Sequence, residues 1–128
     1  MARVISTHLI RLYPGITEEE LFRFMRDEVY PAPQLPGWNG YLAKGYYGDR
    51  ADQYIWIWEI ESVDCLKRFF PAEDQPSEEF KVWIATHPEV NDVMKKWATY
   101  SPTLPTANTV YTDYVVIEPR KANGHLPD

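Results

Sequence analysis

The strongest hydrophobic pattern in the chain is the run from Gln53 to Ser62, which is dense in β-branched and aromatic residues. Alternation with a period of two divides it into two faces, Tyr54, Trp56, Trp58 and Ile60 on one and Ile55, Ile57, Glu59 and Glu61 on the other. Because both faces are mainly apolar, the pattern predicts a central strand covered on both sides. Helices of this chain can supply one cover, and we expect a second copy of the protein to supply the other.

Further strands are expected at 4–13, 38–47 and 109–118. A helix is expected to begin at a capping box formed by Thr17 and Glu20 and to end at Pro31. After Ser62 a second helical region is expected in pieces, at 63–70, at 77–86 and from Pro88 onward. Glycines in the strand at 38–47 indicate an edge strand or a bulge.

This order of elements predicts an α+β fold, a ferredoxin-like sandwich with a four-stranded antiparallel sheet and helices on one face. The first and third strands are expected to be central. The other face would carry Ile5, Leu9, Ile55 and Ile57, and we expect two subunits to pack sheet to sheet into an α+β barrel. Residues 1–118 are interpreted as one domain and residues 119–128 as a flexible C-terminal tail.

Composition narrows the classes of function. Of the 128 residues, 45% are hydrophobic and 15% aromatic, and no apolar run is long enough to span a membrane. The N-terminus lacks the pattern of a signal peptide and Cys65 is the single cysteine, so a cytoplasmic location is expected. The net charge of −6 argues against a nucleic-acid partner.

Several short segments resemble parts of the dimeric α+β barrel superfamily, over about residues 4 to 117. His8-Leu9-Ile10 is similar to the start of olivetolic acid cyclase proteins, and Tyr13-Pro14-Gly15 to antibiotic-biosynthesis monooxygenase domains. Leu35-Pro36-Gly37-Trp38 is similar to EthD-like proteins, and His87-Pro88-Glu89-Val90 to several polyketide cyclases. The resemblance implies a homodimer with a pocket between sheet and helices, and it predicts fold better than chemistry.

Two histidines are candidate catalytic residues. His8 should share the helix-facing side of its strand with Ile10 and Leu12, and its imidazole could take a proton from an enol or phenol. The alternative is a core histidine with a hydrogen-bond partner. His87 could be a second acid or base, and its alternative is a helix N-cap or surface residue before Pro88.

The aromatic residues suggest a site for a flat ligand. Expected substrate-binding residues are Tyr54, Trp56, Trp58 and Tyr46 from the sheet, with Met25, Trp83 and Trp97 from the helical side. Packing in the core is the alternative for each of them.

Two hypotheses for function follow. The first is an enzyme without metal or other cofactor that cyclises, isomerises or oxygenates a planar aromatic or polyketide-like molecule, with His8 as acid or base. The second is a non-catalytic dimeric binding or stress-response module for a hydrophobic ligand. An open cavity of several hundred Å³ with His8 and a tyrosine at its wall would favour the enzyme, and a closed space around His8 would favour the module.

Overall fold

A computed structural model describes residues 3–73, 75–104 and 112–118 of the chain. The elements follow in the order β1 (Val4–Ile10), α1 (Glu18–Phe24), the π-helix η1 (Met25–Val29), β2 (Trp38–Lys44), β3 (Tyr54–Ile60), α2 (Val63–Phe69), α3 (Glu78–Ala85), α4 (Pro88–Tyr100) and β4 (Thr112–Val116). The last strand, β4, was expected to start at residue 109, but residues 109–111 lie outside the described part of the chain. The expected C-terminal tail at 119–128 lies outside it as well.

The four strands form one antiparallel sheet in the order β2-β3-β1-β4. The α+β class and the central positions of β1 and β3 are therefore confirmed, and β2 is an edge strand as its glycines indicated. The connectivity is compatible with a ferredoxin-like arrangement. No helix within the described residues is both long and apolar enough to cross a membrane.

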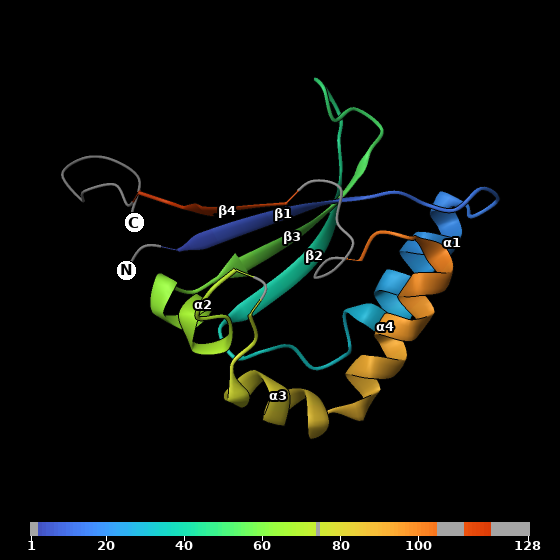
Figure 1. The fold of residues 1–128 in the computed structure, drawn as a ribbon. Helices are drawn as coiled ribbons and strands as arrows, with labels where there is room; N and C mark the ends of the chain where they lie inside the picture. The colour runs from blue at the N-terminus through green and yellow to red at the C-terminus, as the bar shows by residue number, and fades with distance from the viewer. Residues whose placement is uncertain (1–2, 74, 105–111, 119–128) are drawn as a thin grey trace.

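The helices lie on one face of the sheet (Figure 1). Register shows which residues share that face, since Val4 pairs with Ile60, Ser6 with Trp58 and His8 with Trp56. Residues directly opposite each other in a sheet project to the same side. The period-two interpretation of Tyr54, Trp56, Trp58 and Ile60 as the helix-facing side is thus correct.

Side-chain caps define where three helices begin. The hydroxyl of Thr17 accepts a hydrogen bond from the backbone N–H of Glu20, at 3.2 Å, and acidic residues fill the first turn of α1. Ser62 caps α2 and Ser77 caps α3 in the same way. The helix expected up to Pro31 ends instead in a π-helical turn, in which the N–H of Tyr30 reaches the carbonyl of Met25.

The first strand is shorter than expected because the chain leaves the sheet after Ile10. The N–H of Arg11 donates to the hydroxyl of Thr103, and the N–H of Tyr13 donates to the carbonyl of Tyr100, both at 2.9 Å. These bonds tie the end of β1 to the segment that follows α4.

Two clusters of buried residues fill the space between sheet and helices. The first lies under α1, η1 and α4 and consists of Ile10, Leu21, Phe24, Met25, Val29, Trp56 and Trp97. The second lies under α2 and consists of Val4, Leu35, Trp38, Ile60 and Phe69. Trp58 packs against both clusters.

Gly40 allows the two indoles of β3 to lie across β2. A methyl group at this position would meet Cζ2 of Trp56 and would lie 2.6 Å from Cζ3 of Trp58. We expect Gly40→Ala to lower the free energy of unfolding by about 1 to 3 kcal/mol, because the rings must move out of their packing. Urea unfolding measures the change.

The control is Val82→Ala at an exposed position of α3, away from the sheet, which should change stability by less than about 0.5 kcal/mol. Equal losses in the two variants would show that the indoles do not need the space above Gly40.

Candidate functional site

The main apolar cavity lies between β2, β3 and the helices and has a volume of about 120 Å³. All five tryptophans of the chain line it: Trp38, Trp56, Trp58, Trp83 and Trp97. Its other lining residues come from the end of η1 and the connection after it, from the residue that follows α2, and from α3 and α4; they are Val29, Ala32, Pro33, Gln34, Leu35, Phe70, Phe80, Ile84, Val90, Val93 and Met94. Of the predicted substrate-binding residues, the structure brings together Trp56, Trp58, Trp83 and Trp97 at this cavity.

The indoles pack edge to face. The ring centroids of Trp56 and Trp58 are 5.4 Å apart with an angle of 81° between the planes, and those of Trp56 and Trp97 are 4.9 Å apart at 83°. Trp38 meets Trp58 in a similar way, at 5.5 Å and 76°. This geometry places the positive edge of one ring against the negative face of the next, which is the favoured arrangement for aromatic pairs.

The indole N–H groups of Trp56, Trp58 and Trp97 are buried and have no hydrogen-bond partner within the described part of the chain. The N–H of Trp38 is buried and has no partner there in the same way. The cavity is therefore surrounded by hydrogen-bond donors that lack strong acceptors.

Gln34 is a polar side chain at the cavity that sequence reasoning missed. Its Oε1 accepts a hydrogen bond of 2.8 Å from the backbone N–H of Gly40. Because a backbone N–H can pair only with an oxygen, this bond also fixes which end of the amide is which. The NH₂ group of Gln34 and the second lone pair of its Oε1 remain for other partners. A glutamine in a proline-rich connection carries no periodic signal that could have indicated this position.

His8 lies on the helix-facing side of β1, as predicted, but it is not among the described residues that line the cavity. Its side chain is 1% exposed, its Nε2 is hydrogen-bonded to the hydroxyl of Ser6, and its ring meets Tyr114 edge to face at 6.0 Å. Burial lowers the pKa of His8 to about 4. The imidazole is therefore neutral at pH 7.

His87 occupies the N-cap position of α4, and its side chain makes no capping bond there. Its ring stacks on Trp83 with centroids 4.4 Å apart, and its Nδ1 donates to the carbonyl of Trp83 at 2.7 Å. The contact supports the orientation of Trp83 at the edge of the cavity. His87 itself is not one of the described lining residues.

Three further predicted substrate-binding residues lie elsewhere. The hydroxyl of Tyr54 donates to Glu18 at 3.0 Å, and Glu18 also pairs with Lys44 at 2.7 Å, which ties the start of α1 to the sheet. Tyr46 is 82% exposed in the hairpin between β2 and β3, which projects beyond the sheet (Figure 1). Met25 is buried in the first core cluster.

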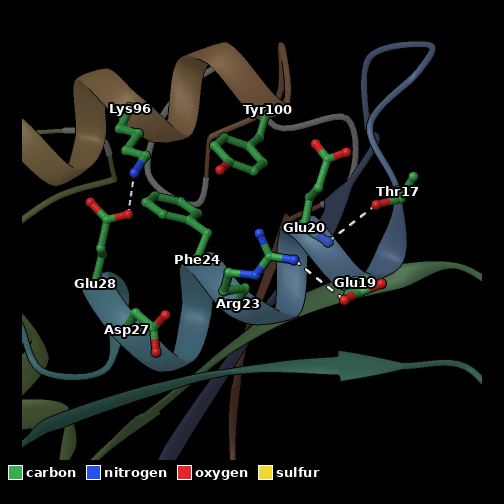
Figure 2. Close-up of a pocket in the computed structure, with 9 residues that line it drawn as sticks. All are labelled: Thr17, Glu19, Glu20, Arg23, Phe24, Asp27, Glu28, Lys96 and Tyr100. Atoms are coloured by element: carbon green, nitrogen blue, oxygen red, sulfur yellow. Dashed lines mark hydrogen bonds and ion pairs between the residues drawn. The ribbon is translucent and has the colours of Figure 1, made fainter.

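A second hollow, of about 590 Å³, lies between α1, η1 and α4 (Figure 2). Its walls are charged side chains that largely pair with one another, with Lys96 bound to Glu28 and Arg23 to Glu19. At its base Phe24 stacks on Tyr100 with centroids 4.6 Å apart. This hollow is a solvated surface between helices. We therefore take the apolar cavity lined by the five tryptophans, called the indole cavity from here on, as the candidate site.

Within residues 3–73, 75–104 and 112–118, no three His, Cys, Asp or Glu side chains are grouped so that they could hold a metal ion. Comparison of the sequence with models of protein families and with curated proteins found no match to either. The resemblance to the dimeric α+β barrel superfamily therefore stays a prediction.

The depressed pKa of His8 predicts a pH dependence of stability. The unfolded chain binds a proton near the ordinary pKa of 6.5 and the folded chain only near 4, so stability falls as the pH decreases from about 6.5 to 4. Between pH 7 and pH 5 we expect the wild type to lose about 2 kcal/mol more than His8→Gln, whose side chain does not titrate. Urea unfolding at both pH values measures this.

Hydrogen bonds to Lys44 and Arg68 lower the carboxyl pKa values of Glu18 and Glu79, and because both residues are present in both proteins their titration cancels in the comparison. Equal losses of unfolding free energy between pH 7 and pH 5 in the wild type and in His8→Gln would contradict the neutral, buried state of His8.

Proposed function

We propose that the protein is a binding module that holds a small aromatic ligand in the indole cavity and does not use His8 for catalysis. One observation carries the proposal: five indoles surround a space that, among the described residues, has no titratable side chain on its wall. General acid-base catalysis needs such a group within hydrogen-bond reach of the substrate. Binding needs only shape and apolar area.

The properties of His8 also favour a binding module over an enzyme that uses this histidine. A base is most effective when its pKa is close to the working pH, and burial holds the pKa of His8 at about 4. A ligand in the cavity would meet Trp56, the cross-strand neighbour of His8, and not His8 itself. The enzymatic role of His8 and His87 stays a prediction, and the geometry gives it less support than the binding role.

The size of the cavity limits the ligand. An engineered protein cavity of about 150 Å³ binds benzene, whereas pockets for drug-sized ligands measure roughly 300 to 1,000 Å³. At about 120 Å³ the indole cavity suits a single aromatic ring. Edge-to-face contacts with the surrounding indoles would add to the free energy of binding. A polyketide with several fused rings would require the walls to move.

We also propose that the module is a homodimer formed through the open face of the sheet. By register this face carries Ile5 and Thr7 of β1 opposite Glu59 and Ile57 of β3, whereas Leu9, opposite Ile55, is already buried within the chain. Tyr41 of β2 lies opposite Ile57, and its hydroxyl donates to Glu59 at 2.9 Å. A sheet face rich in isoleucine is normally covered, and a second copy would supply a matching surface about a two-fold axis.

Filling the cavity should abolish ligand binding. Val90 lines the cavity from α4 and belongs to neither buried core cluster, so Val90→Phe should place a ring in the space without rebuilding the core. We expect the variant to bind ethylbenzene at least tenfold more weakly than wild type, measured by titration calorimetry or ligand-detected NMR.

The matched control is Val82→Phe on α3, where the valine is 61% exposed and is not among the described lining residues. It should bind as wild type does. Unchanged binding to Val90→Phe would place the binding site outside the cavity.

A charge on the open face should separate the subunits. Ile57→Lys places an ammonium group at the centre of the proposed interface, where it would be buried without a partner. We expect sedimentation equilibrium to show a dimer for wild type and a monomer for the variant. Val82→Lys, the same type of change on the exposed side of α3, should leave the dimer intact. A monomeric wild type would exclude this interface.

A further inference from the structure

We infer that the ligand of the indole cavity is a neutral single-ring aromatic molecule that carries a hydrogen-bond acceptor and no donor, such as an aromatic ketone or aldehyde. The inference rests on the ligand-binding function proposed above. It is drawn from the polar groups at the wall of the cavity and from what those groups leave unpaired.

The polar side chains at the wall offer more donors than acceptors. Among the described residues that line the cavity, they are the five tryptophans and Gln34. An indole can donate through its N–H and has no acceptor atom in the ring plane. The one good acceptor among these side chains, Oε1 of Gln34, already accepts a hydrogen bond from the N–H of Gly40 and has one lone pair left. The sulfur of Met94 is only a weak acceptor.

Two of these donors are almost fully buried and unpaired. The side chains of Trp56 and Trp97 are 2% and 1% exposed, and their N–H groups find no acceptor in the part of the chain that the structure describes. Both indoles pack edge to face with neighbouring indoles, and these ring contacts supply no oxygen acceptor for the N–H groups. A carbonyl in the cavity could satisfy one of these donors once a rotation of the ring turns its N–H toward the ligand.

The same wall disfavours two other classes of ligand. A carboxylate would lose its hydration, and no cationic side chain is found among the described lining residues to compensate it. A hydroxyl or amine would bring a further donor to a place where donors are already in excess, and its hydrogen would compete for the one remaining lone pair of Gln34 Oε1. Neutral molecules with acceptors only avoid both penalties.

The experiment uses four probes of similar size: ethylbenzene, acetophenone, 1-phenylethanol and benzoate. Binding to the full chain is measured by calorimetry, and the assigned indole N–H signals of the five tryptophans are followed by ¹H–¹⁵N NMR. We expect acetophenone to bind about tenfold more tightly than 1-phenylethanol, the difference that one unpaired donor produces. Benzoate should not bind measurably.

The NMR signals test the hydrogen bond itself. Acetophenone should move the N–H proton of Trp56, Trp58 or Trp97 downfield, and ethylbenzene should not. Gln34→Glu keeps an oxygen for the N–H of Gly40 and replaces the free NH₂ by an acceptor. The substitution should weaken the binding of acetophenone about threefold or more and the binding of ethylbenzene by less than about twofold.

The outcomes separate this inference from the proposed function. If ethylbenzene binds but 1-phenylethanol binds as tightly as acetophenone, or no indole proton moves downfield, the preference for acceptors is wrong and the binding function stands. Failure of all four probes to bind would overturn the proposed function and this inference with it.

Discussion

The packing of the β3 indoles against β2 is the constraint on which the rest of the structure depends. Trp56 and Trp58 project from the same side of a central strand, and the absence of a side chain at Gly40 provides the room for both. Trp97 of α4 then meets Trp56 edge to face. The cavity is the space that these rings leave.

This arrangement is costly for a protein that needs only a stable core. Each buried N–H without a partner lowers stability by about 1 to 3 kcal/mol, and Trp56, Trp58 and Trp97 each carry one. Phenylalanine at these positions would keep an aromatic ring without an unpaired donor. A native structure that retains such groups together at a cavity has the features expected of a binding site, because ligand contacts can recover part of the loss.

The fold could be predicted from the sequence to the extent that local patterns determine it. Alternation in β3 identified its helix-facing residues and its central position, and Thr17 and Pro88 marked the starts of two helices. Tyr46 was placed at the site because the strand was expected to continue to residue 47, but pairing in β2 ends at Lys44 and Tyr46 lies in the exposed hairpin.

Placement on a face does not determine which side chains meet at a cavity. The period of two put His8 on the correct side of β1, but the lining of the cavity depends on which strand carries the large rings and which helix covers them. These are contacts between segments far apart in the sequence. Gln34 shows the same limit, since its role depends on a bond to Gly40 that no local pattern encodes.

A polar pair on the helix-facing side of β1 lies beside the apolar cavity, and this separation bears most directly on function. Ser6 and His8 are hydrogen-bonded to each other, and neither is among the described residues that line the cavity. Trp56 stands between the pair and the cavity, as the partner of His8 across β1 and β3 and as a wall of the cavity. Recognition by indoles is therefore compatible with the packing, and proton transfer between His8 and a ligand in this cavity would require the buried Trp56 indole to move.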